Sequence, residues 1–346
     1  MTRPMTAGFR AGALAACALS LGLAPAAAEQ VHPWIDAKLL AAAKKEGTLV
    51  VYSSTNEREG LAMFKLFEQA TGIKVQYVRA ADSVLTSRMS IEFRGGKSSF
   101  DIVHMTAVAR LPPQMLLQYE PPEAKAIPAS ARDPNRRWYG VYSVYNTPAY
   151  NTKLVKRSEL PKSYEEMAKL KQFKGKIAID GTDNEWLRAL ALHYGEKKGL
   201  DIARSLAANL NPVITVGHLA LSRSVGGGEY AMSINNYTNL DINVKLAGGA
   251  IEIFALNPVA QFFGSVGINS KAPHPAAAKL AANFMLSREL QQFYTKFGRP
   301  PTRTDVTPNP PDALDGIKKR KVIPVLMTAA EEKKWNATFN QIFKRR

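Results

Sequence analysis

Thr48-Leu-Val-Val-Tyr-Ser-Ser-Thr-Asn56 is the stretch of sequence that decides the fold. Its first six residues form a nearly continuous apolar run, which is typical of a strand buried on both faces. The hydroxyl and amide side chains that follow favour the start of a helix, whose apolar spacing ends at Thr71 before a glycine. A second strand is expected at 73–78, a second helix at 83–93 and a third strand at 100–105. This order predicts a βαβαβ unit with a parallel sheet.

The same alternation returns in the second half of the chain. Its expected strands cover residues 176–180, 230–235 and 251–256, and its expected helices cover 185–195, 200–209, 276–286 and 289–297. Between the halves, residues 138–150 are rich in Tyr, Val and Asn, which indicates an extended crossover. We therefore expect an α/β protein with two lobes, each a mixed, mostly parallel sheet flanked by helices and joined by hinge crossovers.

The first 28 residues have the pattern of an export signal. Arg3 and Arg10 precede an apolar run at 11–23, and the alanines at 26–28 form a small-residue cleavage site. The apolar run is too short for a membrane span, which takes about 20 residues. We expect Sec-dependent export to the periplasm and removal of residues 1–28.

The single cysteine, Cys17, lies inside this signal. Leu14-Ala-Ala-Cys17 also matches a bacterial lipoprotein box, so a lipid anchor at Cys17 is the alternative to cleavage after residue 28. Cleavage leaves a mature chain without cysteine, which excludes thiol catalysis and cysteine-ligated metals. It also lowers the formal net charge of +17 to +15. A basic balance suggests nucleic acid as a partner, but export argues against it.

Several segments, taken in order, resemble the bacterial extracellular solute-binding proteins. They are residues 48–55, 67–75, 100–103, 228–237 and 267–275. The resemblance extends over residues 48 to 305, and the branch that it favours is the ferric-binding proteins of periplasmic ABC importers.

This resemblance implies a type II periplasmic binding fold with a ligand in the cleft between two lobes. It implies lobe one at 29–141 plus 260–300, lobe two at 142–259, and a C-terminal helical segment at 301–346 that packs on the lobes. It also implies the substrate-binding subunit of an ABC importer, which delivers a small molecule or metal chelate to a permease in the inner membrane. We expect a monomer with no cofactor, no catalytic residues and no nucleic-acid partner.

Candidate ligand-binding residues of the first lobe follow its strands, where open α/β sheets take their ligands. Ser54, Thr55 and Asn56 come after the first strand, and Thr106 comes after the third. Their hydroxyl and amide groups suit an anionic group at a helix N-terminus, or they simply cap that helix. Tyr145 in the crossover could stack on an organic ligand or serve packing alone.

The second lobe offers acidic and aromatic candidates. Asp183, Glu185 and Trp186 begin a helix, and Asn236 and Tyr237 end a strand. The carboxylates suit a hard cation or an ammonium group, but acidic residues also favour a helix N-terminus. The indole of Trp186 covers the ligand or fills the core.

The ligand itself is the open question. In the ferric-binding branch, two adjacent tyrosines, a histidine and a glutamate hold the iron. Here Tyr237 matches the first tyrosine, whereas Thr238, Asn56 and Thr106 occupy the other positions. One ligand of four argues against bare iron(III), so Tyr237 is the metal candidate and an iron chelate stays open. Phosphonates, carboxylates and polyamines without iron are alternatives. An exported hydrolase is the alternative of another class, for which GxSxG and HExxH motifs are missing from the sequence.

Overall fold

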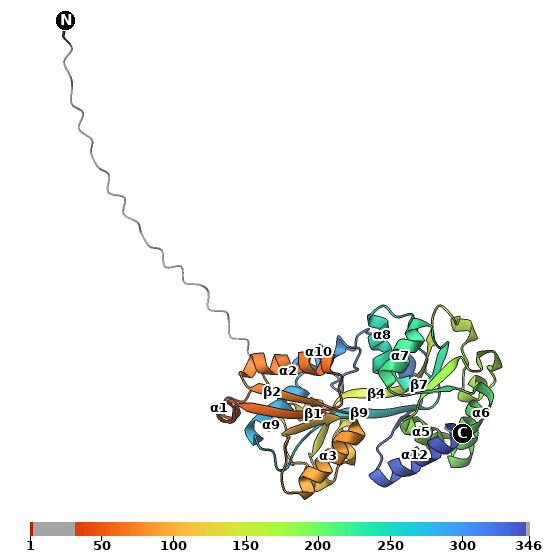
Figure 1. Ribbon diagram of the computed structural model, residues 1–346, viewed down its shortest axis with the longest axis horizontal. Coiled ribbons are helices and arrows are strands. Elements are labelled where there is room, and N and C mark those ends of the chain that lie inside the picture. The colour runs from red at the N-terminus through yellow and green to blue at the C-terminus, as the bar shows by residue number, and fades with distance from the viewer. Residues whose placement is uncertain (3–31, 344–346) are drawn as a thin grey trace. The chain divides into compact units, whose positions relative to one another are not determined.

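Residues 1–2 and 32–343 are described by the structure, a computed structural model (Figure 1). The predicted export signal and Cys17 lie outside these residues. The folded body begins at Pro33. In the part of the chain that the structure describes, no helix is both long and apolar enough to cross a membrane.

The first half of the body is the predicted βαβαβ unit. Its elements are α1 (Ala37–Glu46), β1 (Thr48–Ser53), α2 (Glu57–Thr71), β2 (Lys74–Arg79), α3 (Asp82–Arg94) and β3 (Ile102–Met105). β1 lies in the middle and pairs in parallel with β2 and β3. α2 ends at Gly72, whose φ of 76° lets its N–H reach the carbonyl of Glu68 and close the helix.

The second half repeats the alternation with shorter strands. Its elements are α4 (Tyr164–Met167), β5 (Ile177–Asp180), α5 (Asn184–Tyr194), α6 (Glu196–Leu210), β6 (Val213–Thr215), α7 (His218–Gly227), β7 (Met232–Tyr237), α8 (Thr238–Leu246) and β8 (Ile251–Ile253). β5 pairs in parallel with β6 and with β7. The carboxyl ends of these three strands therefore meet at one edge of the sheet.

Two long antiparallel strands connect the halves. They are β4 (Trp138–Asn151), which is the predicted crossover, and β9 (Val259–Ile268). β9 also pairs with β3, and β4 also pairs with β7, so the sheets expected for two lobes form one continuous sheet. Its order is β2-β1-β3-β9-β4-β7-β5-β6, with β10 (Val322–Pro324) on β9 and β8 on β4. Figure 1 shows β4 and β9 running between the helices that surround β1 and those that surround β7.

The remaining elements cover the sheet and its ends. The helices are α9 (Pro275–Leu286), α10 (Arg288–Thr295), α11 (Asp315–Lys318) and α12 (Ala329–Phe343). Short 3-10 helices are η1 (Val108–Arg110), η2 (Pro113–Met115), η3 (Pro122–Ala126), η4 (Ala129–Ala131), η5 (Arg157–Glu159) and η6 (Lys171–Phe173).

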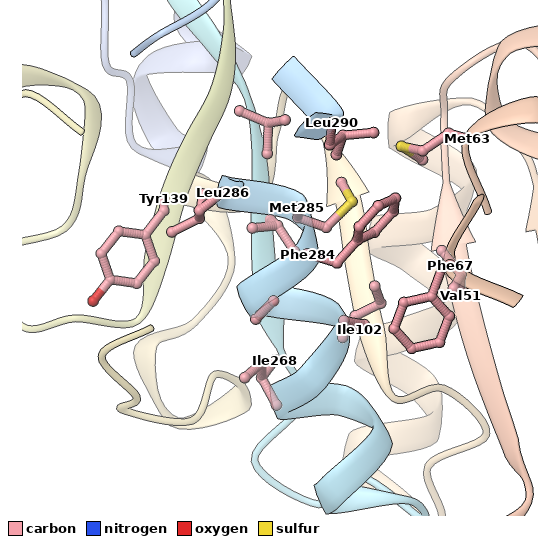
Figure 2. Close-up of a cluster of buried hydrophobic side chains, with 14 of the residues drawn as sticks. Val51, Met63, Phe67, Ile102, Tyr139, Ile268, Phe284, Met285, Leu286 and Leu290 are labelled. Carbon is pink, nitrogen blue, oxygen red and sulfur yellow. The ribbon is translucent and has the colours of Figure 1, made fainter. Parts of the chain in front are cut away.

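Each half has its own hydrophobic core. In the first, Phe284 of α9 packs against Phe67 of α2 with ring centroids 5.6 Å apart, and Val51 and Ile102 of the sheet lie beside them (Figure 2). The second core gathers around Trp186 and receives Phe339 from α12, so part of the C-terminal segment packs there. The lobe boundaries at 141/142 and 259/260 stay predictions, because β4 and β9 contribute to both cores.

Candidate ligand-binding cleft

A cleft of about 470 Å³ lies at the carboxyl ends of strands from both halves. The turns after β1, β2 and β3 line it from one half, and the turns after β5, β6 and β7 line it from the other. Strand β4, Arg299 and two residues of α12 complete the wall. This is where open α/β sheets take ligands, and the volume suits a small solute.

Six of the predicted ligand-binding residues line this cleft. They are Ser54, Thr55, Asn56, Thr106, Glu185 and Tyr237. The strand ends that the sequence indicates therefore bring together residues from both halves.

The other four predicted residues lie behind the wall. The side chain of Asp183 is fully buried and accepts hydrogen bonds from Asn235 Nδ2 at 2.6 Å and Asn146 Nδ2 at 3.4 Å. Burial, with nearby carboxylates adding to it, raises the pKa of Asp183 well above its usual value. From the sequence, Asp183 is a candidate because a carboxylate suits a hard cation or an ammonium group. Here the carboxyl group instead bonds two asparagines of the interior.

Trp186, Tyr145 and Asn236 likewise serve the interior. Trp186 is fully buried and packs edge-on against Tyr164, with ring centroids 5.6 Å apart, so it fills the core instead of covering the cleft. The Tyr145 hydroxyl accepts a hydrogen bond from Gln261 Nε2 at 3.1 Å. Asn236 is buried beneath the cleft, where it supports a histidine.

That histidine, His218, stacks on Tyr237 at the second half's face of the cleft. The two ring centroids are 3.5 Å apart and the rings are inclined by 16°. Asn236 Nδ2 donates to Ser222 Oγ and to Asp241 Oδ1, both at 2.8 Å, so Asn236 Oδ1 is left to accept from His218 Nδ1 at 3.0 Å. This network places the ring proton on Nδ1.

Both rings of the stack are neutral at pH 7. Burial lowers the pKa of His218 below its usual value. Burial raises the pKa of Tyr237 well above its usual value, and the nearby carboxylates of Glu185 and Asp183 raise it further. The stacked pair therefore offers a flat, uncharged face to a ligand.

Arg110 of η1 binds two carboxylates of the opposite wall. Its Nη2 donates to Glu185 Oε1 of α5 at 2.5 Å, and its Nη1 donates to Glu332 Oε1 of α12 at 2.7 Å. These contacts satisfy both carboxylates with one guanidinium. The triad also ties η1, which follows β3, to helices of the second half.

Asp82 and Asp180, the other two carboxylates that line the cleft, accept hydrogen bonds from the loops that follow neighbouring strands. Asp82 Oδ2 accepts from Thr106 Oγ1 at 2.5 Å and from the N–H of Ala107 at 2.9 Å. Asp180 Oδ2 accepts from the N–H of Gly217 at 2.6 Å. The acidic groups of the cleft are thus already bonded to donors of the chain.

The N-termini of helices bring positive partial charge to the cleft wall, opposite in sign to its carboxylates. α2, α3, α5, α7 and α8 all place first-turn or capping residues in the cleft wall. For these described helices, the N-cap side chain makes no capping hydrogen bond; the N-cap residues are Asn56, Ala81, Asp183, Gly217 and Tyr237. First-turn N–H groups have no partner inside the helix and carry the positive end of its dipole. Arg79 is an exposed cleft residue for which the described chain provides no carboxylate partner.

The arrangement contains little that would hold a bare metal ion. Among residues 1–2 and 32–343, no group of three or more His, Cys, Asp or Glu side chains is placed to do so. Tyr237 lines the cleft, but the nearby Asp183 and Glu185 bond asparagines and Arg110.

Several cleft residues were not among the sequence candidates. Arg110 follows β3 by five residues, and its position after a strand end is a signal that could have identified it. Arg299, Glu332 and Asn336 come from the C-terminal third of the chain, where no strand end points to them.

Comparison with known proteins places this geometry in a family. Residues 62–320 match the bacterial extracellular solute-binding protein family. Iron-bound HitA from Pseudomonas aeruginosa is 22% identical, with a TM-score of 0.71 over 85% of this chain and 99% of HitA. AfuA from Actinobacillus pleuropneumoniae, a periplasmic binding protein with fructose-6-phosphate bound, is 20% identical, with a TM-score of 0.71 over 87% of this chain and 99% of AfuA.

A third similar structure is the substrate-binding protein of an ABC transporter from Agrobacterium tumefaciens. It is 15% identical, with a TM-score of 0.74 over 86% of this chain and 96% of that one. At such identities the likeness shows the fold, which is the two-lobed type II periplasmic binding fold predicted from the sequence. Because the family match spans most of the chain, this protein belongs to the bacterial extracellular solute-binding proteins.

Proposed function

We propose that this protein captures a small anionic solute in the cleft and delivers it to an ABC permease in the inner membrane, acting in the periplasm without catalysis. One observation carries the proposal. The carboxylates that line the cleft already bond donors of the chain, whereas the helices that begin at the cleft have no side-chain N-cap bond and Arg79 has no carboxylate partner among the described residues, so both can meet an anion.

A cationic solute such as a polyamine needs carboxylates that can release their present partners. Glu185 is buried and bonded to Arg110, so turning it toward a cation would leave a largely buried guanidinium with one partner fewer. An anion needs no such exchange, because first-turn amides can donate to it directly. The net charge, +17 for the full chain and +15 after the expected cleavage, also attracts anions over longer distances.

Capture would couple to a change in conformation. A solute that contacts both walls binds most tightly when they are close together, so it shifts the population toward that state. The permease would then distinguish loaded from empty protein by the closed form. β4 and β9 are the connecting strands through which the walls could move.

An anionic iron chelate is the second candidate. HitA, a similar structure, is iron-bound, and Tyr237 of this chain lies in the cleft wall. A ferric complex of an organic acid carries its own oxygen ligands, so it would need only one or two from the protein. Such a chelate remains within the class of anionic solutes.

A thermal-shift screen tests the proposal. The protein is unfolded and refolded to remove any bound solute, then mixed with citrate, a hexose phosphate, methylphosphonate, ferric citrate or spermidine at matched ionic strength. A binder at about 100 times its Kd stabilises by about 2.7 kcal/mol and raises Tm. We expect at least one anion to raise Tm and spermidine to leave it unchanged. A response to spermidine alone would overturn the proposal.

A further inference from the structure

Arg299 is a buried cation in the wall of the cleft. Only 4% of the residue is exposed, yet it lines the cleft. It follows Gly298, whose φ of 73° makes the tight turn after α10. A Cβ at Gly298 would lie 2.6 Å from Ile242 of α8, so this turn needs glycine and packs closely on that helix. The guanidinium is therefore carried by a rigid turn.

Three contacts fix the orientation of this guanidinium. Its Nε donates to Glu59 Oε2 at 2.6 Å, and its Cζ lies 4.2 Å from the ring centre of Tyr142 and 5.5 Å from that of Tyr294. Among the described residues, none accepts a hydrogen bond from its two terminal nitrogens. Glu59 lies in the first turn of α2, so the ion pair holds Arg299 beside the N-terminus of that helix.

Thr55 points to a ligand at the same place. It is 4% exposed and lines the cleft, and its Oγ1 has no hydrogen-bond partner in the described structure. Its backbone carbonyl accepts from the Tyr77 hydroxyl at 2.7 Å, which holds the residue in position. A buried hydroxyl without a partner is costly, so a solute atom that bonds to it gains free energy.

The geometry points to an oxyanion subsite in which Arg299, Thr55 and the first-turn amides of α2 hold the phosphate or carboxylate head of the solute. This inference rests on the proposed function and adds which wall receives the charged end. The two terminal nitrogens of Arg299 form a planar fork that matches two oxygens of one oxyanion. Glu59 occupies Nε alone and leaves that fork available. The flat pair of Tyr237 and His218 on the opposite wall then faces the rest of the solute.

Arg299→Lys tests the subsite because it keeps the charge and removes the fork. Titration calorimetry is performed on the full mature chain with inorganic phosphate and, in a second arm, with citrate, at constant ionic strength. We expect the variant to bind the preferred oxyanion about tenfold more weakly, which corresponds to about 1.4 kcal/mol. The arm with the larger loss identifies the head group as phosphate or carboxylate.

Arg303→Lys is the matched control. Arg303 is also buried and ion-paired, to Asp305 and Glu123, but it is not part of the cleft wall. We expect this variant to bind as the wild type does. Thr55→Val is a second probe. Since Thr55 Oγ1 has no partner to lose in the described structure, the variant should keep its Tm while binding weakens severalfold.

The outcomes separate this inference from the proposed function. If Arg299→Lys and Thr55→Val both bind like the wild type, the subsite is refuted, while anion capture elsewhere in the cleft stands. If the wild type binds neither phosphate nor citrate, the subsite is also refuted. If spermidine is then the only stabilising compound in the screen, the proposed function falls as well.

Discussion

Replacing Asp241 by asparagine should change the free energy of unfolding by an amount that becomes more favourable as pH rises. Asp241 is a buried residue of α8, and its Oδ1 accepts from Ser222 Oγ at 2.7 Å and Asn236 Nδ2 at 2.8 Å. Its Oδ2 is buried and has no hydrogen-bond partner in the part of the chain that the structure describes. Burial raises the pKa of Asp241 from 3.8 to about 7, against the lowering effect of those two hydrogen bonds.

The sign and size of this pH-dependent change in the free energy of unfolding follow from proton binding. Between pH 3.8 and about 7, the native state keeps a proton that the unfolded chain releases. The native state therefore binds more protons, and the free energy of unfolding falls as pH rises through this window. Each pH unit costs about 1.4 kcal/mol, which reaches about 4 kcal/mol at neutral pH. The loss is complete above the folded pKa and absent below the unfolded pKa.

Asparagine keeps the acceptor at Oδ1 and has no charge to bury. Its new N–H group lacks an acceptor, which lowers the free energy of unfolding of the variant by about 1–3 kcal/mol at every pH. The test is therefore the change in the difference between variant and wild type, and not its absolute value. Titrations shared by both proteins, such as that of His104, whose pKa burial lowers to about 3, cancel in that difference.

Urea denaturation of both proteins at several pH values between 4 and 8 measures the difference. Asp201→Asn is the control, because Asp201 lies on the surface of α6 and pairs with Lys197 and Arg204. We expect the Asp241→Asn curve to rise away from the wild type, whereas the control shows no such rise. Parallel curves for Asp241→Asn and the wild type would refute a neutral buried Asp241.

Three further substitutions test other parts of the structure. Trp186→Ala should lower the free energy of unfolding by about 3–5 kcal/mol in urea denaturation, and a loss under about 1 kcal/mol would contradict its place in the core. Arg110→Met should cost about 3–5 kcal/mol because it leaves buried Glu185 unpaired, and adding Glu185→Gln should recover much of this; no recovery would contradict the triad. Tyr237→Phe should keep Tm within a few degrees and abolish any visible phenolate-to-iron absorption with ferric citrate, and a band that survives would exclude this phenol as the ligand.

The elements of the first half could be predicted because each carries its own local signal. β1 has the predicted bounds, since an apolar run and the turn residues after it are adjacent in sequence. The third strand was expected from Phe100 but begins at Ile102. Asp101 explains the difference, because its Oδ2 accepts the N–H of Val50 at 2.7 Å where a strand residue would offer a backbone carbonyl.

The cleft was harder to predict than the strands. Glu185 lines it and the adjacent Trp186 fills the core, since neighbouring helix residues point about 100° apart. Choosing between them requires knowing which face of α5 meets the sheet. Arg110 and Glu332 are 222 residues apart, and Arg299 and Glu59 are 240 apart. No periodicity links residues at such separations, so only the folded chain shows that they pair.

These distant partners are also the reason why the proposed function favours an anionic solute over a cationic one. Asp180, Asp183 and Glu185 are close in sequence and suggest an acidic site, yet each is bonded to a donor from elsewhere in the chain. A carboxylate that already accepts strong hydrogen bonds attracts a cation less, because the cation must displace those donors. The charge that a solute meets is therefore set by the cleft groups that are not already bonded within the chain. These are Arg79, the two terminal nitrogens of Arg299 and the helix N-termini. An acidic segment can thus form the wall of a site for anions.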